Sequence, residues 1–259
     1  MSVSSARWGL RRYYPRMSTH YETLRHTSAY AEAFGVEAPA AASELHLWPR
    51  MSGFFIRAPA APQAPLAEGE GAAADAAPPR RRELVPAQWG LVPHWVKSAS
   101  DGKLRAPKLV NAKSDLVSTG TAFRDAWLQG QRCIVPMAAF YEDDFRQGSK
   151  ARPTRIARVD GKPMGAAGLW ARWQGPDGEE LFSYALITVN ANNHALMNRY
   201  QQPGSEKSMP AILNEGAYDA WLNARVDKAK EFLRQYPAQS LTANPVETKA
   251  DKVPKGWLE

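Results

Sequence analysis

Beyond residue 50, short apolar or alternating segments follow one another along the chain, and Gly, Pro and Asp-Gly pairs interrupt them. This pattern is typical of β-strands. The strand-like segments lie at residues 54–59, 84–92, 131–142, 152–173 and 181–191. Asp160 and Gly161 predict a hairpin turn, and so do Pro176, Asp177 and Gly178.

Helical spacing of apolar positions is found on both sides of this strand-rich region. Residues 21–34 place apolar side chains near helical spacing, and Gly35 ends the pattern. Residues 218–222 and 227–236 carry apolar side chains three or four positions apart, and Pro237 follows them. We therefore expect an α+β fold, a single domain with a curved, mostly antiparallel β-sheet or barrel-like core flanked by helices.

Two parts of the chain lack the composition of a folded segment. Residues 1–16 are rich in Arg and Ser and have no continuous apolar core, which indicates a disordered extension or a start codon placed too early rather than a secretory signal. Residues 58–82 consist largely of Ala, Pro, Gly and Glu with almost nothing to bury, which predicts a disordered insertion. The domain is therefore expected at residues 17–259, with this insertion inside it.

Composition and charge narrow the range of partners. The 259 residues carry a net charge of +7, and a basic surface attracts polyanions such as nucleic acids. The single cysteine, Cys133, excludes an internal disulfide, fits a reducing cytoplasm and lies in an apolar run that predicts a buried, inert thiol. No apolar run reaches the ~20 residues that span a membrane. We expect a cytoplasmic monomer without a membrane partner, associated with the nucleoid when it is on DNA.

Tryptophans beside basic segments point to single-stranded DNA. Unstacked bases lie on aromatic faces while cations hold the phosphates. Trp89 and Trp95 stand at the two ends of the segment WGLVPHW, and Lys113, Arg124 and Arg199 are candidate phosphate contacts. The ordinary alternatives are that the tryptophans fill the core and that the cations are only solvated. These five residues are the predicted DNA-binding residues.

Two polar residues are candidates for proton transfer and substrate orientation. Glu142 ends an apolar run and is followed by two aspartates, so its proton affinity should be raised and it could act as a general acid or base. The alternative is an acidic turn after a strand. Asn111 follows a β-branched valine and either orients a substrate or caps a helix. The histidines show no paired spacing with one another or with carboxylates, so we expect neither a metal site nor a cofactor.

Six segments, taken in order, give the chain a more specific pattern. They read WGLVPHW from Trp89, VNAKSD from Val110, AFRDAW from Ala122, RCIVPMAAFYE from Arg132, AGLWARW from Ala167 and MPAIL from Met209. Together they resemble the SOS response-associated peptidase (SRAP) family, whose members cap abasic sites in single-stranded DNA. The resemblance extends from Met17 to about Pro245, interrupted by residues 58–82. It implies the SRAP fold and, as partner, single-stranded DNA with abasic sites.

The resemblance also implies four catalytic positions. In the family, loss of the initiator methionine exposes a cysteine, whose amine forms a Schiff base with the aldehyde of the abasic site and whose thiol then closes a thiazolidine. Met17 matches the initiator, and the cysteine position falls on Ser18. Asn111 and Glu142 match the family's asparagine and glutamate, whereas the family's histidine position falls on Gln201.

The two substitutions leave three functional hypotheses open. A hydroxyl is a far weaker nucleophile than a thiol of pKa ~8.5, so ring closure should be weakened, although a free α-amine still forms a Schiff base. Ser18 has that amine only if translation starts at Met17 rather than at Met1. The chain is an enzyme acting on abasic DNA through Ser18 as a Schiff-base former or lyase, a non-catalytic single-stranded DNA binder, or a peptidase limited to processing its own N-terminus.

Overall fold

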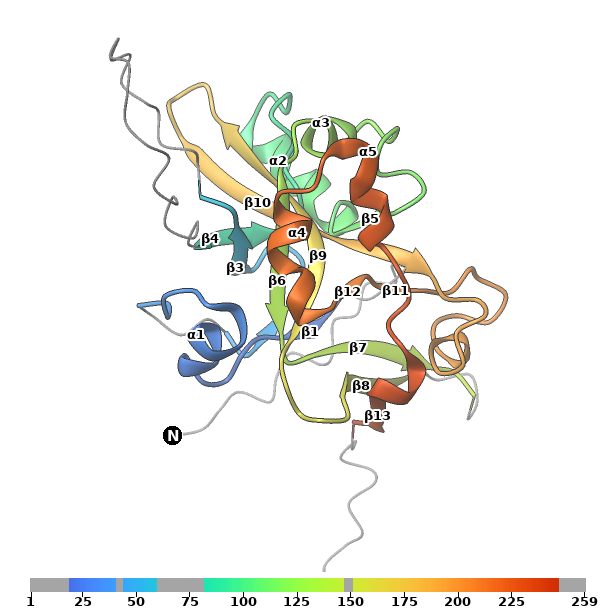
Figure 1. Ribbon diagram of the computed structural model, residues 1–259. Helices are drawn as coiled ribbons and strands as arrows, with labels where there is room; N and C mark the ends of the chain where they lie inside the picture. The colour runs from blue at the N-terminus through green and yellow to red at the C-terminus, as the bar shows by residue number, and fades with distance from the viewer. Residues whose placement is uncertain (1–18, 41–43, 60–81, 147–150, 247–259) are drawn as a thin grey trace, which may run out of the picture.

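The computed structural model describes residues 19–40, 44–59, 82–146 and 151–246 (Figure 1). The predicted extension at 1–16, the candidate residue Ser18 and nearly all of the predicted insertion at 58–82 lie outside the described residues. The predicted states of these segments therefore stay predictions. The described elements form one α+β domain, as the sequence predicted.

Five strands close into a barrel at the centre of the domain. They are β3 (Ser52–Arg57), β4 (Glu83–Trp89), β6 (Arg132–Met137), β9 (Met164–Gln174) and β10 (Glu180–Asn190). Their order is β10-β4-β3-β6-β9, and β9 pairs again with β10, which closes the ring. The pairs are antiparallel except for β4 with β10. A closed barrel of this size is filled by its own side chains, so ligands are expected at its rim.

Three short strands extend the barrel sheet: β5 (Asn111–Lys113), β11 (Ser208–Pro210) and β12 (Ile212–Leu213). β5 runs parallel to the end of β10 and β11 runs antiparallel to it, so Thr188 of β10 is aligned with Lys113 on one side and with Pro210 on the other. Strands on either side of a third lie about 10 Å apart. The end of β10 thus brings two segments that are distant in sequence to one rim of the barrel.

A second sheet lies below the barrel in the view of Figure 1. In spatial order its strands are β13 (Leu241–Pro245), β8 (Arg152–Arg158), β7 (Ala139–Asp144), β1 (Tyr21–Glu22) and β2 (His46–Leu47). Only Ala138 separates β6 from β7. The apolar run at 131–142, which the sequence presented as one strand, therefore divides between the two sheets.

The helices are short and cover the outside of the sheets (Figure 1). The α-helices are α1 (Ser28–Phe34), α2 (Ala99–Arg105), α3 (Arg124–Leu128), α4 (Tyr218–Leu222) and α5 (Val226–Ala229). The 3-10 helices are η1 (Ala106–Lys108), η2 (Met197–Arg199), η3 (Glu215–Ala217), η4 (Lys230–Phe232) and η5 (Ala238–Ser240). α4 packs on the barrel, where the indole N–H of Trp221 donates to the carbonyl of Cys133 at 2.8 Å.

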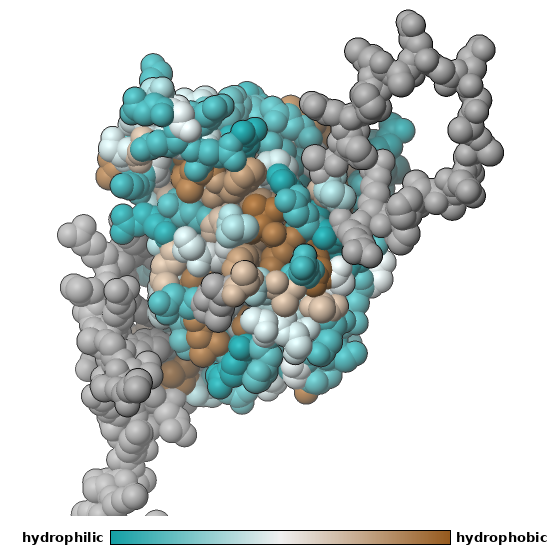
Figure 2. Space-filling model, turned by 90° about the vertical axis from the view of Figure 1, so that its left-hand side faces the viewer, coloured by the Kyte–Doolittle hydropathy of each residue, from teal (hydrophilic) through white to brown (hydrophobic). Residues whose placement is uncertain are grey.

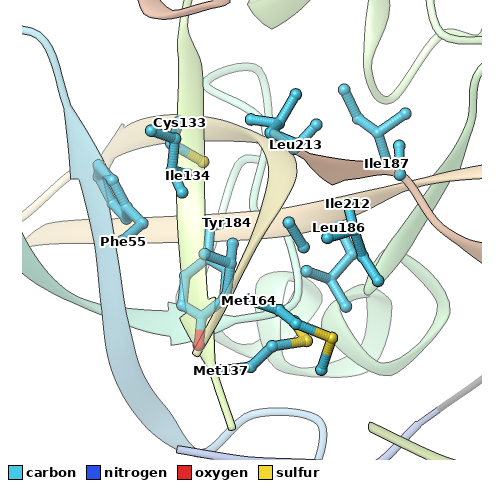
Figure 3. Packing of buried hydrophobic residues seen from close by; sticks show 14 of the residues in the cluster. Phe55, Cys133, Ile134, Met137, Met164, Tyr184, Leu186, Ile187, Ile212 and Leu213 are labelled. Carbon is cyan, nitrogen blue, oxygen red and sulfur yellow. The ribbon is translucent and has the colours of Figure 1, made fainter. Parts of the chain in front are cut away.

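The core is continuous between the barrel and the covering elements (Figure 3). Cys133 is fully buried, as predicted, and burial raises the pKa of its thiol well above the ordinary value. The hydroxyl groups of Tyr21 and Tyr184 share a hydrogen bond inside this core. A Cβ at Gly53 would lie 2.5 Å from the Tyr184 hydroxyl, so only glycine allows β3 to pass this pair.

Several predicted elements differ from those observed. Of residues 21–34 only the second half is helical, because Tyr21 and Glu22 form β1 and pair with β2 and β7. Gly35 ends the helix as predicted, with a φ of 63°. Of residues 227–236, the first three complete α5 and the next three form η4. The turn at 160–161 joins strands of different sheets, so it is not a hairpin.

Candidate functional site

β5 carries two predicted site residues, Asn111 and Lys113. Its position is supported by Trp89, whose indole N–H donates to the carbonyl of Val110 at 3.2 Å, directly before Asn111. Asn111 is buried, whereas the side chain of Lys113 is partly exposed. Trp89 is itself fully buried, which leaves no face of its ring open to a base. The prediction that Trp89 stacks on DNA is corrected accordingly: this tryptophan holds β5 in place.

Glu142 lies in β7 opposite Thr154 of β8 and is buried. The strand continues through Asp144, so the alternative of an acidic turn directly after the strand does not hold. Asp144 forms an ion pair with Arg146 at 2.7 Å, and this hydrogen bond lowers the pKa of Asp144 despite its burial. Glu142 is therefore a carboxylate held on a strand of the second sheet.

Gln201 lies beside β7 and contacts Asp143, the residue that follows Glu142. Its backbone N–H donates to the carbonyl of Asp143 at 2.8 Å, and its φ of 66° places it in the left-handed region. Its side-chain Nε2 donates to the carbonyl of Ser208 at 2.7 Å, and its Oε1 accepts the N–H of Ser208 at 3.1 Å. Both ends of the amide thus bind the first residue of β11.

The loop between Gln201 and Ser208 carries two charged residues that the sequence did not single out. Lys207 places its Nζ 2.6 Å from the carbonyl of Gln202 and 3.3 Å from that of Gln201. Burial lowers the pKa of Lys207, and the nearby carboxylate of Glu142 opposes this shift. The ammonium group therefore lies within electrostatic reach of Glu142.

Glu206, the other charged residue of this loop, connects it to β5. Glu206 forms an ion pair with Lys113 and accepts a hydrogen bond from Nδ2 of Asn190 at 3.1 Å. The hydrogen bond from Lys113 lowers the pKa of Glu206, and the one from Asn190 adds to the effect. In the sequence, Glu206 and Lys207 could have been noticed as an adjacent acid and base shortly before the MPAIL segment.

These contacts join three parts of the chain into one site at the end of β10. We call it the rim site; its residues are Asn111, Lys113, Glu142, Gln201, Glu206 and Lys207. Arg199, the second predicted cation of this region, is exposed in η2 two residues before Gln201.

His194 has a structural role. Its Nε2 lies 2.7 Å from the carbonyl of Tyr236, to which it donates, and its Nδ1 accepts the N–H groups of Leu196 and Met197 at 3.2 and 3.0 Å. This pattern fixes the neutral tautomer. His194 therefore caps η2 and does not replace a histidine at position 201.

The start of the described chain lies next to Glu142. The N–H of Tyr141 donates to the carbonyl of His20 at 3.0 Å. The ring of His20 is stacked between those of Trp48 and Tyr141, with centroid distances of 4.2 and 3.9 Å. This stack fixes the chain two residues after Ser18 against the residue that precedes Glu142.

An ion pair between the buried Glu22 and the partly exposed Arg155 supports the same segment. Glu22 accepts hydrogen bonds from Nε of Arg155 at 2.7 Å and from the hydroxyl of Tyr141 at 3.1 Å. Burial alone would raise the pKa of Glu22, but Arg155 and Tyr141 outweigh it and the pKa is lowered. Burial, together with the charge of Glu22, raises the pKa of Tyr141 to about 12. These contacts connect β1, β7 and β8, the part of the second sheet that carries Glu142.

Trp95 and Arg124 belong to a second group, at a shallow hollow that is open to solvent. Each is the sequence neighbour of a residue that lines the hollow, His94 and Asp125, and the side chains of these two lie 3.9 Å apart. The guanidinium group of Arg105 lies 5.3 Å from the centre of the Trp95 ring, and Arg124 forms an ion pair with Asp125 at 3.1 Å.

Exposed apolar surface is limited on the described residues. On the face shown in Figure 2, apolar side chains gather near the middle and hydrophilic ones surround them. The large apolar side chains that are exposed in the described ranges are Trp95, Leu104, Leu116, Leu128 and Val159. Trp95 is the aromatic member of this set, so it has the surface that base stacking needs.

Comparison with known proteins assigns the chain to a family. Residues 16–253 match the family described as SOS response associated peptidase (SRAP). The chain belongs to the SRAP family. The resemblance that the sequence segments indicated is therefore confirmed, and the match includes the rim site and the hollow at Trp95.

Relatives of this SRAP chain have been named for abasic-site processing. Abasic site processing protein YoqW of Bacillus subtilis is 30% identical over 162 residues, which are 61% of this chain and 67% of that protein. Abasic site processing protein HMCES of Gallus gallus is 29% identical over 193 residues, 66% of this chain and 55% of that protein. The chain thus spans about half the length of the vertebrate relative.

Solved structures share the SRAP fold of this chain. A Bordetella bronchiseptica protein aligns with a TM-score of 0.76 and 35% identity, over 89% of this chain and 100% of that one. A Bacteroides thetaiotaomicron protein aligns with a TM-score of 0.69 and 21% identity, over 88% and 92% of the two chains, and this likeness concerns the fold alone.

The described residues contain neither a candidate metal site nor a membrane-spanning helix. No group of three or more His, Cys, Asp or Glu side chains in these ranges could hold a metal ion. No helix in the described ranges is long and apolar enough to cross a membrane.

Proposed function

We propose that this SRAP protein binds abasic sites in single-stranded DNA at the rim site. The observation that carries the proposal is the meeting of Glu142, Lys113 and the start of the described chain at the end of β10. Relatives named abasic site processing proteins support the same assignment. An abasic nucleotide has no base to stack, so its sugar can enter a polar site at a strand end while neighbouring nucleotides remain outside.

Solvent-accessible residues and the buried carboxylate would have different roles in DNA binding. The partly exposed Lys113 and the exposed Arg199 would contact phosphates on either side of the abasic sugar. Trp95 and Arg124 would receive more distant nucleotides beside the hollow. Glu142, being buried, would face the sugar itself.

We propose that this chain carries out the covalent step of the family less effectively. With Met17 as the start, Ser18 would offer its α-amine two residues before His20, whose carbonyl accepts the N–H of Tyr141. Its hydroxyl would close a ring less readily than a thiol does.

Gln201 favours a second candidate, binding without a stable covalent product. A catalytic group at this position would have to transfer protons, but the amide of Gln201 does not titrate and its two polar atoms bind Ser208. The chain would then protect abasic single strands by occupancy alone.

Fluorescence anisotropy tests the binding proposal. Single-stranded oligonucleotides should bind more tightly than the corresponding duplex, and affinity should fall as salt rises because cations displace counterions from phosphates. Arg199→Ala should weaken binding and reduce the salt dependence, whereas Arg225→Ala, an exposed cation of the α5 N-terminus, should change neither. Equal affinity for duplex and single strand, or affinity that is independent of salt, would overturn the proposal.

Borohydride trapping on an abasic oligonucleotide tests the covalent step. A chain that begins at Ser18 should be trapped through its α-amine, and a chain that begins at Met1 should not be trapped at Ser18. If both chains bind abasic strands and neither is trapped at any residue, the non-covalent candidate is supported instead.

A further inference from the structure

Lys207 is held inside the rim site by its own loop. Its N–H donates to Oδ1 of Asn192 at 2.8 Å, and its carbonyl accepts the N–H of Ala191 at 2.8 Å. The carbonyls of Gln201 and Gln202 hold its Nζ at 3.3 and 2.6 Å. A surface lysine ordinarily extends into solvent, whereas both the main chain and the amine of Lys207 are fixed here.

The position of this amine relates it to Glu142 through Gln201 and Asp143. The carbonyl that it contacts belongs to Gln201, whose N–H binds the carbonyl of Asp143 in β7. An ammonium group has three donors, and the two loop carbonyls use two of them. One donor direction is left for a carboxylate or a substrate oxygen.

We propose that Lys207 is an amine that forms a Schiff base with the aldehyde of the abasic site, with Glu142 moving the protons. The inference rests on the proposed function and adds to it a reactive group that does not depend on where translation starts. It therefore applies to the chain from Met1, in which Ser18 has no free amine.

The chemical step balances without a further reactant. The Lys207 ammonium gives a proton to the Glu142 carboxylate, and the neutral Nζ adds to C1′ of the ring-opened sugar to form a carbinolamine. The Glu142 carboxyl returns its proton to the carbinolamine hydroxyl, which leaves as water while the C–N double bond forms. One positive charge is present before and after, on the ammonium and then on the iminium.

The surroundings of Lys207 suit this step better than those of Lys113. Burial lowers the pKa of Lys207, which increases the neutral fraction of its amine near pH 7, although Glu142 partly opposes the shift. The amine of Lys113 is instead engaged in an ion pair with Glu206. Lysines activated by partial desolvation are the usual Schiff-base formers in enzymes.

The test is borohydride trapping of the full chain from Met1 on a single-stranded oligonucleotide with one abasic site, followed by peptide mapping by mass spectrometry. Borohydride reduces the imine to a stable secondary amine, which marks the reacting residue. We expect the adduct on the peptide that contains Lys207. Lys207→Arg keeps the positive charge but does not form the imine, so it should reduce trapping by about tenfold or more while DNA affinity and Tm remain close to those of the wild type.

Lys230→Arg is the matched control, because Lys230 is exposed in η4 outside the rim site, and it should trap as the wild type does. An adduct that maps to another residue, with Lys207→Arg trapped at the wild-type level, would overturn the inference. Absence of any adduct on a protein that still binds abasic strands would also overturn it and leave the proposed function standing. A wild-type chain that neither traps nor binds would overturn both.

Discussion

Removal of the Gln201 side chain tests whether this residue, at a position expected to be catalytic, instead holds β11 in place. Gln201→Ala deletes both hydrogen bonds to the backbone of Ser208 and leaves the N–H···O bond to Asp143 intact. Glutamine and alanine both carry a Cβ, so the backbone cost of a φ of 66° is nearly the same before and after. The change therefore isolates the two side-chain bonds.

The magnitude follows from the burial of Ser208. Two neutral hydrogen bonds contribute about 1 kcal/mol each, and an unpaired buried group costs about 1 to 3 kcal/mol more, so we expect a loss of about 3 to 5 kcal/mol. Ser208 is only 5% exposed, which limits replacement by water. For a domain of this size each kcal/mol lowers Tm by about 2 to 4 °C, so the expected fall is about 6 to 20 °C.

Thermal unfolding followed by circular dichroism measures this difference. Gln202→Ala is the control, because the Gln202 side chain is exposed and only its carbonyl contacts Lys207; its Tm should stay within about 1 °C of the wild type. If Gln201→Ala unfolds at the wild-type temperature, the amide does not hold β11 and the structural interpretation of position 201 is refuted.

Three further predictions concern other parts of the molecule. Glu142→Gln should reduce borohydride trapping while DNA affinity stays level or rises slightly, since a negative charge leaves a basic protein; a sharp fall in Tm with unchanged trapping would instead make the carboxylate structural. Trp95→Ala should weaken single-stranded DNA binding about tenfold at constant Tm, whereas Trp89→Ala should cost about 3 to 5 kcal/mol of stability in thermal unfolding. The pKa of Glu22 is lowered, so its contribution to stability should be complete above its ordinary pKa of 4.5 and be lost as pH falls below that value. Glu22→Gln should therefore flatten the acid side of a Tm profile, and an unchanged profile would contradict the role of Arg155.

Much of the fold could be predicted because the strands follow local patterns. Alternating or continuous apolar runs matched β3, β4, β8, β9 and β10, and the apolar residues of α4 recur at helical spacing. The two-residue strands β1 and β2 could not be found this way, since a pair of residues has no periodicity and pairs only in its tertiary context. The same holds for the division of the run at 131–142, because both halves are buried and equally apolar.

The site was less accessible to sequence reasoning than the fold. Asn111 and Glu142 could be named because each is a polar residue at the end of an apolar run. The proximity of Glu142 to Lys207 depends on tertiary contacts, because the loop that carries Lys207 leads into β11 beside the end of β10. Trp89 was misassigned because an aromatic residue beside Gly and Pro has the same sequence signature whether it is buried or exposed.

The most direct test of the account compares the affinity of the full chain for one single-stranded oligonucleotide with and without a central abasic site, at fixed salt. If the rim site accepts the sugar of a nucleotide that lacks its base, as proposed, the abasic strand should bind more tightly. A charge-removing control, Lys113→Ala, should weaken both strands by similar factors, because it removes a phosphate contact rather than a contact to the sugar. Equal affinity of the wild type for the two strands would contradict the account, even if both strands were bound tightly.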